Sequence, residues 1–230
     1  MYDYDQVAWH GSDAVNALRV ALKDTTRFAI EAYVAEQTPD GWRLLYGELS
    51  PARDTFRVSY EATRGSVDTT YTARHIVPAR ADAGQSLAAA RAALLARTTF
   101  GSIERPYNTI VIPQANQWLA YMLPASTDAG WVLGADTRYL VSADGQTVLN
   151  ARRLHNGIME FPMTRPGQAV PVSGVHTDVR DNVPEDSDVF FVLTRMPRIP
   201  EIVATEVFVY RIDATGHVRC SGRTESLRRR

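Results

Sequence analysis

The chain has 230 residues, of which 45% are hydrophobic and 22% charged, a composition typical of a globular protein with one large or two small domains. The formal net charge is −1 at pH 7, so we expect no nucleic-acid partner, and no apolar run is long enough to predict a membrane span. The single cysteine, Cys220, excludes an intramolecular disulfide and a cysteine-rich zinc site.

The first hundred residues carry the signals of two helices and four strands. Residues 12–23 have an apolar face at helical spacing, and residues 86–98 are rich in alanine and leucine, so both are predicted helices. Alternating or apolar runs predict strands at residues 28–36, 42–49, 55–60 and 67–77. The Pro39-Asp40-Gly41 turn makes the first two strands a hairpin, and Pro78 is expected to end the fourth.

After about residue 105 the chain is predicted to consist of strands. The predicted strands span residues 107–112, 118–123, 137–142, 147–154, 189–194 and 202–210. Three segments are almost continuously apolar, which is typical of strands covered on both faces, so we place them at the centre of the sheet: residues 118–123, 189–193 and 207–210. Residues 156–171, rich in proline and glycine, predict a long irregular loop.

These elements predict an α+β fold, a predominantly antiparallel β-sheet of hairpins and meanders with about two helices in the N-terminal half. Residues 1–230 are expected to form a single domain. A subdivision, if present, would separate a helix-hairpin-helix half at residues 1–100 from a strand-rich half at residues 101–230.

Two histidines and two nearby carboxylates are the candidate metal ligands: His155, His176, Asp178 and Asp181. Imidazole and carboxylate groups bind zinc and other divalent cations. The spacing of the histidines fits no compact metal motif, so their side chains would have to meet through the fold. The alternative is a pair of polar residues near strand ends, hydrogen-bonded or solvated. A divalent metal is the one cofactor that the sequence suggests.

Other chemistry is less well supported. The segment Asp178 to Asp188 is rich in carboxylates but lacks the glycine and ligand spacing of a helix-loop-helix calcium site, which favours a solvated acidic turn. His217 precedes Cys220 by three residues and would point to the opposite face of a strand, so we interpret Cys220 as an incidental thiol. The chain lacks a glycine-rich phosphate loop, a Gly-x-Ser-x-Gly elbow and a His-Glu-x-x-His motif, so no catalytic residue is assigned.

Arginine supplies almost all of the positive charge, because Lys23 is the only lysine. Four arginines near predicted strand ends are the candidate ligand-binding residues: Arg152, Arg153, Arg195 and Arg198. If they converged, their guanidinium groups would hold an anionic ligand. The alternative is that they are scattered and solvated.

Three stretches resemble a group of proteobacterial proteins without an assigned function. They are Tyr4 to Ala14, Tyr107 to Ala125, and Tyr139 to Gly145 with the following Arg153-Leu154-His155. Members of that group often carry an export signal. The resemblance implies a bacterial source and a location in the envelope, and it implies no catalytic residue.

These observations favour a non-enzymatic α+β domain that binds a small molecule or a protein. The first alternative is a metal-dependent hydrolase that uses His155, His176 and the nearby carboxylates. The second is a structural or assembly protein whose apolar strands pair in a symmetric oligomer, and the oligomeric state stays open. The acidic, aromatic start at Met1 is unlike a signal peptide, so we expect a cytoplasmic location, or a periplasmic one if a leader has been removed.

Overall fold

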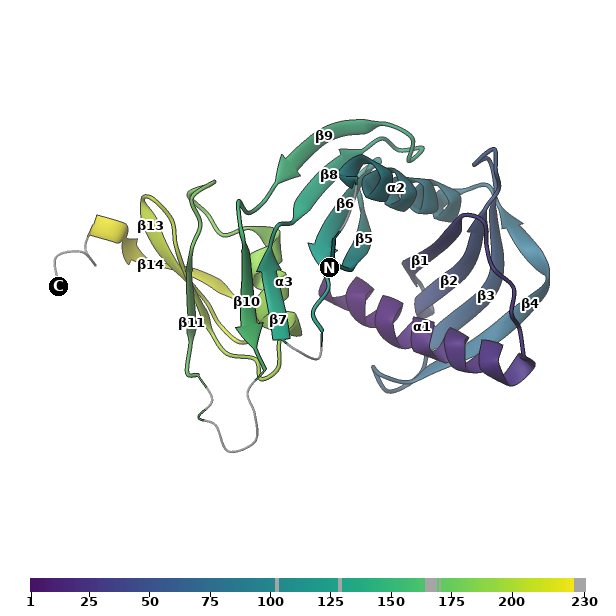
Figure 1. Ribbon diagram of the computed structural model, residues 1–230, viewed down its shortest axis with the longest axis horizontal. Helices are drawn as coiled ribbons and strands as arrows, with labels where there is room; N and C mark the ends of the chain where they lie inside the picture. Colours follow the sequence, from purple (N-terminus) through teal and green to yellow (C-terminus); the bar gives the residue numbers. More distant parts are fainter. Residues whose placement is uncertain (102–103, 128–129, 164–168, 170, 226–230) are drawn as a thin grey trace.

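The computed structural model describes residues 1–101, 104–127, 130–163, 169 and 171–225, and within these ranges the chain forms three helices and fourteen strands. The paired strands are antiparallel apart from β11 and β12, so the predicted α+β class is confirmed. Figure 1 shows a larger body, which contains α1, α2 and strands β1–β6, beside a smaller lobe with α3 and the C-terminal strands. Within the described residues, no helix is both long and apolar enough to cross a bilayer.

The first sheet contains four strands in chain order: β1 (Glu31–Thr38), β2 (Gly41–Leu49), β3 (Phe56–Arg64) and β4 (Tyr71–Asp82). The predicted hairpin between β1 and β2 is confirmed. The prediction that Pro78 ends the fourth strand is wrong, because β4 continues to Asp82. β4 lies at the sheet edge, and its pairing with β3 jumps from His75 to Arg80, so Pro78 falls where no ladder hydrogen bond is required.

The second sheet has the order β5-β6-β8-β9. Its strands agree with the predicted ones: β5 (Tyr107–Gln114), β6 (Gln117–Pro124), β8 (Thr137–Val141) and β9 (Val148–Arg153). The apolar segment 118–123 belongs to β6, an interior strand as predicted. The first sheet lies beside the second, since the Tyr33 hydroxyl of β1 donates to the Thr109 carbonyl of β5 at 3.4 Å.

Two helices cover opposite faces of these paired sheets. α2 (Gln85–Phe100) packs in one core cluster with Val34, Phe56 and Met122. α1 (Tyr2–Leu22) packs in another with side chains from the other face, such as Leu44 and Tyr121. Each cluster combines residues from both sides of residue 100, so the two predicted halves share their cores. Coverage on both faces explains why β6 is apolar on both sides.

α1 begins at Tyr2, whereas the predicted helix began at residue 12. Its buried residues recur every three or four positions from the start of the chain, which is helical spacing: Tyr4, Val7, Gly11 and Val15. Gly11 lets the helix approach the sheet closely, because a Cβ atom there would lie 2.9 Å from Cβ of Leu44. The sequence-based prediction missed the first turns of α1 because the charged residues there interrupt the apolar pattern.

The smaller lobe contains two further sheets. β7 (Gly130–Gly134) pairs with β10 (Ile158–Pro162), and the last sheet has the order β11-β12-β13-β14. Its strands are β11 (Gly174–Thr177), β12 (Glu201–Ala204), β13 (Phe208–Ile212) and β14 (Val218–Arg223). The predicted strand at 202–210 is therefore split in two. The predicted loop at 156–171 contains β10, and its residues 164–168 and 170 lie outside the described ones.

The prediction of a strand at residues 189–194 is wrong, because this segment belongs to α3 (Asp186–Thr194). A short apolar run does not distinguish a buried strand from a buried helix by periodicity. The distinguishing signal precedes the run, where Glu185 and Asp188 form a capping box at the helix start. α3 lies in the connection between the parallel strands β11 and β12, and its Val192 packs with Val203 and Ile212 in a third core cluster.

Candidate functional site

The fold brings His155 and His176 to a single buried carboxylate. His155 follows β9 and His176 belongs to β11, and their ring centroids lie 6.1 Å apart. Nε2 of His155 lies 3.1 Å from Oδ1 of Asp188, and Nε2 of His176 lies 3.0 Å from the same oxygen. Among the described residues, these three form a group whose potential ligand atoms all lie within 4.8 Å of one another.

The other nitrogen of each imidazole lies beside a further carboxylate, a different one for each histidine. Nδ1 of His155 lies 2.9 Å from Oδ1 of Asp136, and Nδ1 of His176 lies 3.0 Å from Oε1 of Glu201. The result is a linear network, Asp136–His155–Asp188–His176–Glu201, called here the histidine network. None of its five residues is more than 5% exposed, so it is shielded from solvent.

The three carboxylates of the histidine network are balanced in charge when both imidazoles are protonated and Arg195 is counted with them. Burial acts to lower the pKa of His155 and of His176, but hydrogen bonds to the neighbouring carboxylates outweigh burial and raise both pKa values. Burial acts to raise the pKa of Asp188, and its bonds to the two histidines lower it to about 2. Arg195 adds a third positive charge, since its Nη1 lies 2.6 Å from Oε2 of Glu201. This contact is an ion pair without the geometry of a hydrogen bond.

The start of α3 orients Asp188. Its Oδ2 accepts the backbone N–H of Glu185 at 2.8 Å, which caps the helix and leaves Oδ1 for the two histidines. The Glu185 carboxylate in turn pairs with Arg152. The acidic residues that precede the apolar run are the sequence signal that could have identified Asp188, and it was missed because the run was interpreted as a strand.

Gly174 makes room for Glu201. The two residues are paired across the parallel strands β11 and β12, and a Cβ atom on Gly174 would lie 2.0 Å from Oε2 of Glu201. The carboxylate therefore lies directly over the glycine, where any larger residue would displace it. No local pattern in the sequence indicates this contact, nor the role of Asp136 in the turn between β7 and β8.

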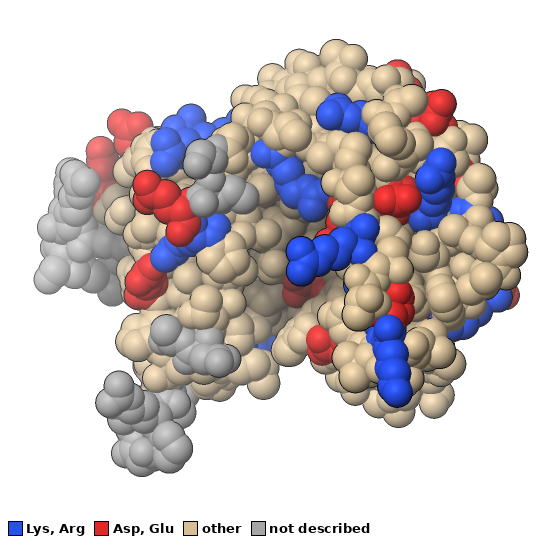
Figure 2. All heavy atoms as spheres, turned by 45° about the vertical axis from the view of Figure 1, so that its right-hand side comes forward, with Lys and Arg blue, Asp and Glu red and all other residues tan. Residues whose placement is uncertain are grey.

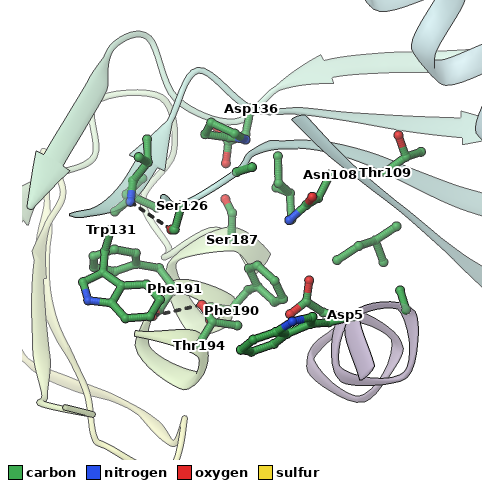
Figure 3. A pocket seen from close by; sticks show the side chains of 18 of the residues that line it. Asp5, Asn108, Thr109, Ser126, Trp131, Asp136, Ser187, Phe190, Phe191 and Thr194 are labelled. Atoms are coloured by element: carbon green, nitrogen blue, oxygen red, sulfur yellow. Dashed lines mark hydrogen bonds between the residues drawn. The ribbon is translucent and has the colours of Figure 1, made fainter. Parts of the chain in front are cut away.

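A cavity of about 510 Å³ lies between α1, α3, β5 and β7. Its walls are largely apolar and include five aromatic side chains: Trp9, Tyr33, Trp131, Phe190 and Phe191. Figure 3 shows Asp5, Asn108 and Ser187 extending into the same space from α1, β5 and α3. We call this cavity the aromatic pocket.

The polar groups of the aromatic pocket are acidic or neutral. Asp5, Asp13 and Asp136 line it, whereas none of the described lining residues is Lys, Arg or His. Burial raises the pKa of Asp5 to about 6, and a hydrogen bond from Gln6 limits the rise. The Ser187 hydroxyl is buried and has no hydrogen-bond partner among the described residues. An unpaired buried hydroxyl is costly, so Ser187 offers an open polar contact.

The aromatic pocket and the histidine network adjoin. Asp136 lines the pocket and also holds Nδ1 of His155, and Ser187 precedes Asp188 in α3. The two sites are otherwise separate, because His155, His176 and Asp188 line neither this cavity nor a second one beside Tyr107 and Arg153.

The candidate arginines each have their own protein partners. Arg152 pairs with Asp181 at 2.9 Å, and Arg198 donates to the Tyr2 hydroxyl at 2.6 Å. Arg153 donates to the carbonyls of His155 and Asn156, and Arg195 donates to those of Ile199 and Pro200. Figure 2 shows basic and acidic side chains interspersed over the face in view, without one basic patch.

The other two candidate metal ligands lie outside the His155–His176–Asp188 group. Asp181 pairs with Arg152. Asp178 is 2% exposed, and its Oδ1 accepts the backbone N–H of Arg180 at 2.9 Å. Its Oδ2 is buried without a hydrogen-bond partner among the described residues. The nearby Asp186 pairs with Arg138 and Tyr121, so the carboxylates of this acidic segment do not converge on one calcium-like centre.

Comparison with known proteins adds no relative: no protein-family model, curated protein or solved structure matches the chain. The site is therefore interpreted from its geometry and chemistry alone.

Proposed function

We propose that this protein is a binding domain that takes up a small molecule in the aromatic pocket, without converting it. The ligand has an apolar or aromatic body and a positively charged group. The observation that carries the proposal is the combination of aromatic walls with acidic groups, and with no basic side chain among the lining residues that the structure describes. A concave, mainly apolar site with a few converging polar groups is the usual form of a small-molecule site.

The aromatic side chains account for the apolar body of the ligand. Trp9 is 59% exposed and lines the pocket, so a ligand that covers it would remove a large apolar surface from water. Trp131, Phe190 and Phe191 surround the same space. The faces of these rings also attract cations, which adds to the preference for a positive group.

Asp5 accounts for the charge of the ligand. Its pKa of about 6 lies below neutral pH, so its carboxylate is ionised there although burial opposes the charge. A cation beside it would replace part of the lost hydration. Ser187 supplies a hydroxyl that can donate to the ligand or accept a hydrogen bond from it.

Three probes of the same shape test this proposal: 2-phenylethylamine, the neutral 2-phenylethanol and the anionic 3-phenylpropionate. Calorimetry and tryptophan fluorescence on the full chain should show the amine binding about tenfold tighter than the alcohol, with the acid weakest. Asp5→Asn should remove the preference for the amine, whereas Asp68→Asn, an exposed carboxylate outside the pocket, should keep it. Absence of binding, or equal binding of amine and acid, would overturn the proposal.

A metal-dependent hydrolase is less well supported. His155, His176 and Asp188 line neither of the two described cavities, and each is at most 5% exposed. An assembly role through exposed apolar strands also has little support, because β6 is covered by the helices of its own chain and residues 189–193 are helical.

A further inference from the structure

We propose that His155, His176 and Asp188 bind one divalent ion of the zinc class in a buried, structural centre. This proposal shares only Asp136 with the aromatic pocket, and the variants in its test leave Asp136 unchanged, so the two proposals can fail independently. The ion would connect the end of β9, the strand β11 and the start of α3.

The distances between the ligand atoms suit such an ion. In a tetrahedral zinc site with metal–ligand bonds of about 2.0–2.1 Å, neighbouring ligand atoms are about 3.3 Å apart. Here the two Nε2 atoms lie 3.1 and 3.0 Å from Oδ1 of Asp188, and all three atoms lie within 4.8 Å of one another. Both nitrogen–oxygen distances are within a few tenths of an ångström of that spacing.

The outer carboxylates orient both imidazoles for metal binding. Asp136 and Glu201 accept hydrogen bonds at Nδ1 of His155 and of His176, so each neutral ring would turn its Nε2 lone pair toward Asp188. Metal-binding histidines almost always donate their other N–H group to a carboxylate or carbonyl in this way. Because both histidines have this arrangement, it is a more specific indication of metal binding than the proximity of two rings alone.

Asp178 lies near this group in the sequence but is not one of its ligands. It follows His176 by two residues, and its N–H extends the β11–β12 pairing by donating to the Ala204 carbonyl at 3.0 Å. Its carboxylate oxygens do not belong to the group whose potential ligand atoms lie within 4.8 Å of one another. The ion would therefore have three protein ligands, with its fourth position left to a small ligand such as water.

Charge and ligand type favour zinc over calcium or magnesium. Once the ion has displaced the two imidazole protons, Asp136, Asp188 and Glu201 face the single guanidinium of Arg195, which leaves two uncompensated negative charges. A divalent ion offsets this excess. Nitrogen ligands suit zinc, whereas calcium and magnesium prefer oxygen alone.

Burial makes the centre structural rather than catalytic. The three ligands are at most 5% exposed, and none lines either described cavity. An ion enclosed in this way would serve the fold, because its binding free energy adds to the stability of the folded state.

The test is titration of the metal-free full chain with Zn²⁺ and with Co²⁺. We expect one equivalent to bind, the Co²⁺ complex to absorb visible light as a tetrahedral site, and the thermal midpoint to rise with Zn²⁺ and return on chelation. Asp188→Asn should abolish stoichiometric binding, and Glu201→Gln, which alters the support of His176 and the ion pair with Arg195, should weaken it about 10–100-fold. His217→Gln, at an exposed histidine, is the matched control and should bind normally.

Each contrary result has a defined meaning. If the folded wild-type chain binds no stoichiometric Zn²⁺ or Co²⁺, the proposal is wrong, and this result needs no variant to fold. It is also wrong if Asp188→Asn, shown to be folded by circular dichroism, binds as tightly as the wild type. Metal-dependent hydrolysis of an ester or peptide that is lost in Asp188→Asn would overturn the structural assignment of the centre.

Discussion

His155 and His176 share one oxygen atom, Oδ1 of Asp188, at 3.1 and 3.0 Å. The histidines lie on separate strands or strand ends, and the aspartate lies in the first turn of α3. The shared oxygen makes Asp188 the centre of the buried polar network, and it makes the start of α3 the point where the two strands are joined.

Replacing Asp188 should destabilise the protein strongly. Asp188→Ala leaves two buried imidazoles without their common acceptor, and removal of one partner from a buried ion pair costs about 3–5 kcal/mol. Urea unfolding measures the loss. Asp68→Ala, which removes a carboxylate that is 84% exposed, should change stability by no more than about 0.5 kcal/mol. Equal effects of the two substitutions would contradict the central role of Asp188.

Gly174→Ala should destabilise the smaller lobe. The new Cβ atom would lie 2.0 Å from Oε2 of Glu201, so the carboxylate must leave His176, and overpacking of this kind costs about 1–3 kcal/mol. Gly157→Ala is the matched control, because its Cβ atom would meet no atom within 4 Å. Unfolding curves of the two variants should differ clearly, and the contact is unimportant if they coincide.

Stability should depend on the ionisation of Asp5. Burial raises its pKa from 3.8 to about 6 in the folded protein, so the folded state binds more protons than the unfolded state between about pH 4 and pH 6. The contribution of Asp5 to the free energy of unfolding therefore falls as the pH rises through this range, and it is constant above it. The difference between wild type and Asp5→Asn, measured by urea unfolding from pH 4 to pH 7, should show this change. A flat difference would mean that Asp5 is solvated.

Docking of α1 should depend on Leu44. This side chain is fully buried and lies against Gly11, so Leu44→Ala opens a cavity beneath the helix and should cost about 2–5 kcal/mol. Leu149→Ala, at a leucine that is 48% exposed, should cost far less. Thermal or urea unfolding compares them, and a similar cost for both would show that α1 is held by other contacts.

Most elements of the larger body could be predicted from local patterns. The β1–β2 hairpin follows from apolar runs around an Asp-Gly turn, and α2 follows from alanine and leucine in a row. The continuous apolar run of β6 correctly indicated an interior strand. The same criterion gave the wrong prediction for α3, because a short run that is apolar on all sides is compatible with a buried helix as well as with a buried strand.

The histidine network was predictable only in its residue types. His155 and His176 stood out in the sequence as possible partners, and Asp188 ends the acidic segment after His176, but Asp136 and Glu201 became visible only in the folded chain. Turns and hydrophobic periodicity depend on residues that are close in the sequence, so the sequence alone predicts them. Long-range packing brings the five residues of the network together, and no local pattern encodes it. They come from the β7–β8 turn, the end of β9, strands β11 and β12, and the start of α3.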